Sequence, residues 1–208
     1  KHSFKTSGGG PNFMAFIEKE LMPVIEKKYR TNDYKLFAGH SFGGLTVLNT
    51  LLSNKDLFDA YIAIDPSVWW HDEYVLNLAK QKLQSENFAG KSLYLAQANN
   101  EITELDTTTY HQRAIMAFKY ELEKYPANGL RWNYRYFEDE DHGSVPLPAE
   151  YYGLKYIYDG YQSEVKMVAE YPEMLTMNFR DISSKLNYEI NPPESLVDWL
   201  GDYCLKTN

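Results

Sequence analysis

The sequence predicts a three-layer α/β fold in which helices cover both faces of a mostly parallel central sheet. Short apolar segments alternate with helix-forming segments through the middle of the chain, which is typical of successive βα units. One apolar segment, residues 36–38, leads directly into Gly-His-Ser-Phe-Gly and then into a helical stretch. Reactive side chains also follow the other apolar segments. Because ligands of such sheets bind beyond the carboxyl ends of the strands, these side chains are expected at one edge.

The chain is expected to begin with a loop and a divided helix. Residues 7–12 are rich in Gly and Pro, and Asn12 is a candidate N-cap for the helix that follows. Apolar residues then recur at helical spacing over residues 13–25. Pro23 is expected to kink or divide this helix, because proline lacks the backbone donor and crowds the preceding turn.

Four strands and three connecting helices are expected in the middle of the chain. The strands are short apolar or alternating segments bounded by turn-forming residues, at residues 34–38, 60–64, 92–96 and 131–137. The helices between them have apolar residues at helical spacing, at residues 45–52, 73–83 and 114–122.

The segment Gly39-His40-Ser41-Phe42-Gly43 has the spacing of a nucleophile elbow. A serine on the sharp turn between a strand and a helix crowds the residues two positions before and after it, so glycine is expected to be required at both flanking positions. The turn would hold the Ser41 hydroxyl clear of the sheet. Ser41 is therefore the candidate nucleophile, and the backbone N–H of Phe42 is a candidate donor to an oxyanion.

A serine hydroxyl is a poor nucleophile until a base takes its proton, so a histidine must reach Ser41. His142 follows the last predicted strand and precedes Gly143, in a loop free to fold over the elbow, and is the candidate base. His40 adjoins the serine, with a ring expected to point away from the hydroxyl, and is a candidate substrate contact. The remaining histidines lie at the terminus or on predicted helices: His2, His71 and His111.

An acid must also orient the base, and here the sequence leaves several choices. Glu101 follows the third strand in a turn-forming Asn-Asn-Glu and is the first candidate. Asp141 adjoins His142 and is badly placed for the distant ring nitrogen. Three further acids remain alternatives: Asp65, Glu104 and Asp106. The order nucleophile, acid, histidine, each just beyond a strand, is that of α/β-hydrolases.

Two aromatic groups are candidates for a binding surface. Trp69 and Trp70 follow the second strand, at the edge where a ligand would bind, so they are candidate substrate contacts, with a purely structural pair as the alternative. Several tyrosines occur over residues 151–161. They either line a cleft for an aromatic or sugar ligand or pack a helix on its neighbours.

Composition excludes several classes of partner. The formal charge of -8, without a basic stripe, argues against nucleic acid. No apolar run approaches the ~20 residues that span a bilayer. The single cysteine, Cys204, excludes an internal disulfide and leaves the compartment undecided between a periplasmic or secreted location and a cytoplasmic one. No phosphate-binding, dinucleotide-binding, zinc or calcium motif occurs, so no cofactor and no metal are expected.

Several motifs together resemble a known family. They are Ser-Gly-Gly-Gly before a Phe-rich helix, Glu-Leu-Met-Pro-Val-Ile-Glu, Gly-His-Ser-Phe-Gly-Gly, Asp-Pro-Ser-Val-Trp-Trp and a late Asp-His-Gly. Over about residues 7–160 the chain is similar to the esterases related to esterase D, the enterochelin (ferric siderophore) esterases and the feruloyl esterase domains. The resemblance implies Ser41 and His142 as nucleophile and base, with an acid near Glu101, where relatives often carry aspartate.

Two parts of the chain depart from the family pattern. The family places several strands before the Ser-Gly-Gly segment, so residues 1–161 are interpreted as the C-terminal part of an α/β-hydrolase domain, with the second oxyanion donor outside this sequence. Such a part would expose a sheet edge, so pairing with an N-terminal segment or a homo-oligomer is expected. Residues 162–208 leave the alternating pattern and are expected to form a helical extension, with helices at 163–170 and 193–205.

The expected reaction is hydrolysis of a small-molecule ester through an acyl-enzyme intermediate, without a metal or organic cofactor. The resemblance implies siderophore esters, hydroxycinnamoyl sugars or small thioesters as substrates. A peptidase or acyltransferase built on the same residues is one alternative. A non-catalytic module that keeps the fold for binding is another.

Overall fold

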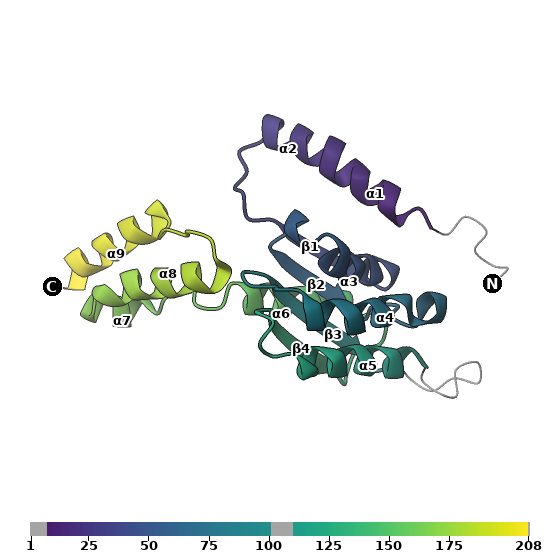
Figure 1. The fold of residues 1–208 in the computed structure, drawn as a ribbon. Helices are drawn as coiled ribbons and strands as arrows, with labels where there is room; N and C mark the ends of the chain where they lie inside the picture. Colours follow the sequence, from purple (N-terminus) through teal and green to yellow (C-terminus); the bar gives the residue numbers. More distant parts are fainter. Residues whose placement is uncertain (1–7, 101–109, 208) are drawn as a thin grey trace.

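A four-stranded parallel sheet forms the centre of the structure (Figure 1). The structure is a computed structural model and describes residues 8–100 and 110–207. The strands are hydrogen-bonded in chain order: β1 (Leu36–His40), β2 (Ala60–Ile64), β3 (Ser92–Ala98) and β4 (Arg131–Phe137). The expected α/β fold is confirmed. The second and fourth strands have the predicted bounds, whereas the first begins and ends two residues later than predicted.

A helix follows each strand, and the first three of these helices lie in the crossovers that parallel pairing requires. These helices are α3 (Phe42–Ser53), α4 (Trp70–Ser85), α5 (Tyr110–Lys124) and α6 (Pro146–Ile157). Helices α3, α4 and α5 cover one face of the sheet and α6 covers the other (Figure 1). Helix α4 starts earlier than predicted and contains three successive left-handed residues, from His71 to Glu73.

Both faces of the sheet are buried, and β2 shows how. Tyr61 and Ala63 pack in the cluster under α3, α4 and α5, whereas Ile62 and Ile64 pack in the cluster under α6. All five residues of β2 are buried. A strand covered on both sides has no polar face, which explains why its sequence is an unbroken apolar run.

The segment before the sheet is a helix interrupted by one π-helical turn. It consists of α1 (Gly10–Phe16), η1 (Ile17–Leu21) and α2 (Met22–Lys28). Pro23 lies in the first turn of α2, directly after the π-helical turn, and the helical residues continue without a break from Gly10 to Lys28, so Pro23 does not divide the helix. The N-cap prediction is wrong: Asn12 lies inside α1, because Pro11 in the first turn fixes a helical φ and the helix starts before it.

Three helices follow α6: α7 (Val165–Glu170), α8 (Glu173–Leu186) and α9 (Glu194–Thr207). The sequence interpretation missed α8, although Phe179, Ile182 and Leu186 recur at helical spacing. These three side chains are buried in the same cluster as α6 and the adjoining sheet face. Asn187 ends α8 in a left-handed conformation. The proposed boundary between a hydrolase part and a helical extension stays a prediction.

Strand β1 forms one edge of the sheet among the described residues. Its five residues are all partly exposed, whereas β2 and β3 are buried throughout. The expected pairing of this edge with further strands or with a second copy stays a prediction. Over the described ranges, no helix combines the length and apolar character needed to cross a membrane.

Candidate active site

Ser41 lies on a strained turn between β1 and α3. Its φ of 58° and ψ of -117° belong to a region that non-glycine residues rarely adopt. The backbone holds this conformation at three points: the Ser41 N–H donates to the Ile64 carbonyl (3.0 Å), and the Ser41 carbonyl accepts from the N–H groups of Leu45 (2.9 Å) and Ser67 (3.1 Å). The turn is therefore fixed to β2 and to the loop that follows β2.

The glycine requirement is only partly as predicted. A Cβ on Gly39 would lie 2.5 Å from the carbonyl carbon of Gly43, so no side chain fits at position 39. A Cβ on Gly43 would meet nothing within 4 Å, so the prediction is wrong there. The second crowded position is Gly44, whose Cβ would lie 3.0 Å from Pro66. Carbonyl oxygens of Gly39 and Ile64, each 3.1 Å from that Cβ, crowd the position as well.

A chain of hydrogen bonds joins Ser41, His142 and Asp65. The His142 Nε2 lies 3.1 Å from the Ser41 Oγ, and the His142 Nδ1 lies 2.6 Å from Oδ2 of Asp65. The three residues follow β1, β4 and β2, so the parallel sheet brings them to one edge. The Asp65 side chain is fully buried, whereas the His142 side chain is 42% exposed. Ser41 and His142, which sequence reasoning paired, are thus in contact.

The Asp65 carboxylate is ionised. Burial by itself raises its pKa, but hydrogen bonds from His111, His142 and the Ala98 N–H outweigh burial and hold the pKa at about 2, below the ordinary 3.8. An ionised carboxylate only accepts hydrogen bonds, so the facing ring nitrogens carry the protons. In neutral His142 the proton is then on Nδ1, and Nε2 is free to accept the Ser41 hydroxyl proton.

His111 is a second histidine on the same carboxylate, and sequence reasoning missed it. Its Nε2 lies 3.0 Å from Oδ2 of Asp65, and its side chain is 14% exposed. Asn100 also donates to Oδ2 (3.2 Å), and the Ala98 N–H donates to Oδ1 (3.0 Å). The position of His111 in the first turn of α5 is a signal that could have found it, because this helix begins at the carboxyl edge of the sheet.

The first candidate for the acid, Glu101, lies outside the described residues, as do Glu104 and Asp106. Among the described residues, the alternative Asp65 contacts His142. Asp141 binds backbone instead, because its Oδ1 accepts from the N–H groups of Gly143 (2.7 Å) and Ser144 (2.8 Å). These backbone bonds lower the Asp141 pKa and fix the turn that carries His142.

His40 packs against the base. Its ring centroid lies 4.4 Å from that of His142, and its Nε2 is buried without a hydrogen-bond partner in the described part of the chain. Burial lowers the pKa of His40, and the neighbouring His142 adds to this. His40 is therefore a neutral ring that limits where His142 can move. Its predicted substrate contact stays a prediction.

An aromatic cluster lies beside the serine. The Phe42 ring meets Trp69 at a centroid distance of 6.1 Å and Trp70 at 4.9 Å, and the two indoles are 5.7 Å apart. Phe42 is 41% exposed. Ser67, in the same loop, places its buried Oγ 3.4 Å from the Ser41 Oγ, a neighbour that sequence reasoning did not single out.

Asp65, His111 and His142 also have the spacing of a possible cation site, since one ligand atom of each lies within 4.8 Å of the others. The carboxylate, however, already accepts four hydrogen bonds, from His111, His142, Asn100 and Ala98. These donors satisfy an ionised and buried carboxylate without a metal. We therefore assign the cluster to hydrogen bonding.

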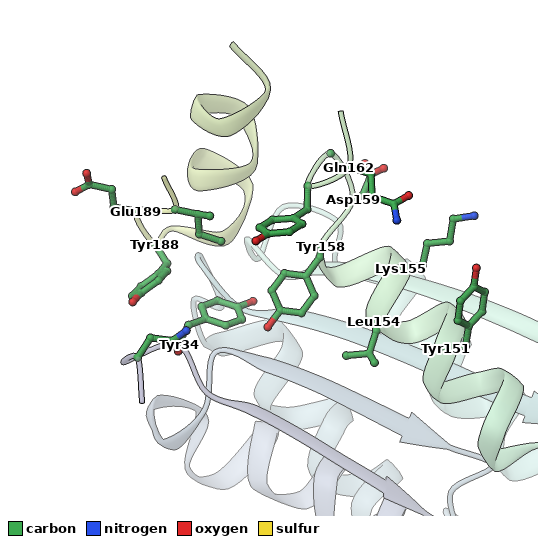
Figure 2. Close-up of a pocket in the computed structure, with 13 residues that line it drawn as sticks. Tyr34, Tyr151, Leu154, Lys155, Tyr158, Asp159, Gln162, Tyr188 and Glu189 are labelled. Atoms are coloured by element: carbon green, nitrogen blue, oxygen red, sulfur yellow. The ribbon is translucent and has the colours of Figure 1, made fainter. Parts of the chain in front are cut away.

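A separate cavity of about 840 Å³ lies near the amino ends of the strands, between α6 and the segment after α8 (Figure 2). Tyr34, Tyr158 and Tyr188 form part of its wall, with Tyr151 and Tyr161 from the predicted tyrosine cluster. Tyr34 precedes β1, whereas Ser41 follows it, so this cavity and the serine lie at opposite ends of the strand. The tyrosines thus line a cavity distinct from the candidate active site.

Comparison with known proteins gives the family. The sequence model of the family described as "Putative esterase" matches residues 2–134, which include Ser41, Asp65 and His111. The chain belongs to this esterase family. His142 lies beyond the matched range and is joined to it by the hydrogen bonds described above.

Relatives of this chain include proteins named as siderophore esterases. The ferri-bacillibactin esterase BesA of Bacillus subtilis (strain 168) is 30% identical over 139 residues, which cover 66% of this chain and 48% of that protein. The siderophore enterobactin esterase of Emericella nidulans is 29% identical over 175 residues, covering 72% and 56%. The chain spans about half the length of these curated relatives.

The chain also resembles a solved structure over almost its whole length. The crystal structure of an IroE-like serine hydrolase from Shewanella oneidensis is 30% identical and aligns with a TM-score of 0.86. The alignment covers 96% of this chain and 62% of that one. The α/β-hydrolase assignment therefore rests on a relative that shares both sequence and fold.

Substituting the two glycines of the elbow is expected to have opposite results. Gly39→Ala should lower the free energy of unfolding by about 1–3 kcal/mol, since the new methyl group meets the Gly43 backbone. Gly43→Ala is the matched control, with room for the methyl group and a change of about 1 kcal/mol at most. Urea unfolding of both variants measures this, and equal losses would contradict the described crowding.

Stability should depend on pH through Asp65. Because its pKa falls from 3.8 to about 2 on folding, the unfolded chain binds the proton more readily, and the stabilisation is present above pH 4 and lost as pH falls through about 2. The loss should amount to about 2 kcal/mol. Urea unfolding between pH 2 and 5 should show a shallower slope for Asp65→Asn than for the unmodified protein. Parallel slopes would show that Asp65 is not ionised preferentially in the folded state.

Proposed function

We propose that the protein is a serine carboxylic-ester hydrolase in which Ser41 is the nucleophile, His142 the base and Asp65 the orienting acid. The hydrogen-bonded chain from the Ser41 Oγ through His142 to Asp65, on a strained turn of the backbone, carries this proposal. The family and the relatives support the reaction class.

In the first step, the Ser41 Oγ attacks the ester carbonyl while its proton passes to Nε2 of His142. The imidazolium that forms is stabilised by the Asp65 carboxylate on its other nitrogen, at 2.6 Å. His142 then gives the proton to the leaving alcohol. In the second half, His142 takes a proton from water, the hydroxide adds to the acyl-enzyme carbonyl, and the acid product leaves as Ser41 regains its proton.

When Ser41 adds to the ester, the carbonyl oxygen becomes negatively charged and must be stabilised by hydrogen-bond donors. Phe42 is the first residue of α3, and the first N–H groups of a helix point away from its body, toward the substrate side of the elbow. We assign one oxyanion donor to the Phe42 N–H.

Asp65 rather than Glu101 is proposed as the acid for a geometric reason. Its carboxylate is rigid, because the backbone N–H of Ala98 and the side chain of Asn100 hold it in place while His142 approaches. Its own backbone N–H is bonded to the Ala96 carbonyl at 2.8 Å. Few rotatable bonds separate the carboxylate from β2, which suits a group that must fix the orientation of a ring.

Siderophore esters are the proposed substrate class. Curated relatives are named as esterases of ferri-bacillibactin and of enterobactin. The partly exposed cluster of Phe42, Trp69 and Trp70 beside Ser41 suits a substrate with aromatic groups, since aromatic rings pack favourably on one another. The predicted role of both indoles as substrate contacts thus becomes part of this proposal.

Replacing the serine tests the proposal. Ser41→Ala should abolish hydrolysis of ferric enterobactin and of a p-nitrophenyl ester, with an unchanged circular dichroism spectrum, because the acyl-enzyme can no longer form. Intact mass should show one fluorophosphonate adduct on the unmodified protein and none on the variant. Ser53→Ala, at the exposed end of the same helix, is the matched control and should be labelled normally.

The remaining results separate the alternatives. Hydrolysis by Ser41→Ala at the unmodified rate would refute the proposed nucleophile. An unmodified protein that resists the fluorophosphonate would favour a non-catalytic binding module. Labelling together with turnover of peptides, or of acyl acceptors other than water, would favour the peptidase or the acyltransferase.

A further inference from the structure

His111 is a mostly buried polar group that the proposed reaction does not use. It projects from the first turn of α5 and places its Nε2 3.0 Å from Oδ2 of Asp65. The same oxygen lies 2.6 Å from the Nδ1 of His142. The two imidazole rings are nearly perpendicular, at 87°, with centroids 5.4 Å apart. Two rings from different elements therefore approach one carboxylate oxygen from different directions.

Other groups also surround the Asp65 carboxylate. Asn100, after β3, donates to Oδ2, and Ala98 at the end of β3 donates to Oδ1. His40 stands behind His142, with a ring that is neutral because burial lowers its pKa. Among the described residues, the groups that face Asp65 and can carry a positive charge are therefore His111 and His142.

We propose that His111 is a positioning residue that fixes the Asp65 carboxylate against His142 and sets how strongly His142 holds a proton. This rests on the proposed function of the Ser41, His142 and Asp65 chain. The Nε2–H of His111 donates to the oxygen that also binds His142, so it withdraws negative charge from that oxygen. The electrostatic attraction between the Asp65 carboxylate and the His142 imidazolium is therefore weaker than it would be without His111.

Removal of this donor has two consequences. The carboxylate loses one of its supports and rotates more freely, so His142 is less well aligned with Ser41. The carboxylate oxygen also becomes more negative, so the imidazolium of His142 is favoured up to a higher pH. The first effect lowers kcat. The second moves the acid limb of the pH–rate profile upward, whether His111 itself is neutral or protonated.

The experiment compares His111→Leu with His111→Gln, because the amide nitrogen of glutamine can reach the position of the imidazole Nε2. For His111→Leu we expect kcat to fall by about tenfold, KM to change less than about twofold, and the acid limb to move up by about one pH unit. His111→Gln should recover kcat to within about threefold and return the limb toward its original position. Tyr120→Leu, at an exposed position of the same helix, is the control.

A second readout does not depend on turnover. The His142 imidazole is titrated by NMR in the unmodified protein and in both His111 variants. His142 should gain its proton at a higher pH in His111→Leu and near the original pH in His111→Gln. Identical titrations and identical acid limbs in all three proteins would overturn the proposal, even if His111→Leu is less stable.

This design separates the two proposals. If the titration shifts as expected but Ser41→Ala keeps its hydrolytic activity, His111 controls His142 and the proposed function is wrong. If Ser41→Ala is inactive and His111→Leu shows no shift, the proposed function stands and His111 only packs. A glutamine variant as impaired as the leucine variant would likewise reduce His111 to a packing role.

Discussion

An ionised carboxylate without solvent contact is the constraint on which this site depends. Asp65 is fully buried, and such a charge is costly unless donors surround it. Its donors come from the end of β3, the start of α5 and the loop after β4. A parallel sheet makes this possible, because its strands all end at one edge. The arrangement of the site therefore follows from the topology rather than from any single loop.

The features that sequence reasoning predicted well depend on local patterns. Strand β2 is buried on both faces and bounded by turns. Its unbroken apolar run therefore begins and ends where the strand does. The tight spacing at Gly39 is equally local, because the backbone that a side chain there would meet is that of Gly43, four residues later. His142 was identifiable because it lies in the loop after the last strand, in a short turn held by Asp141.

What the sequence did not predict depends on distant contacts. Glu101 and Asp65 each follow a strand, and the sequence does not show that donors from the end of β3, the start of α5 and the loop after β4 meet at Asp65. His111 was set aside because a helical position suggests a surface, although the start of a helix lies at the active edge. The restriction at Gly44 has partly the same origin, because Pro66 and Ile64, which are distant in sequence, crowd that position together with Gly39.

The most direct test of the account is the turnover number of Asp65→Asn, compared with that of Glu101→Gln on the same ester. An amide in place of the Asp65 carboxylate cannot stabilise the His142 imidazolium and favours the wrong ring tautomer. The account therefore predicts that Asp65→Asn loses ~10³-fold or more in kcat, whereas Glu101→Gln stays within about threefold. A large loss in Glu101→Gln with an active Asp65→Asn would contradict it.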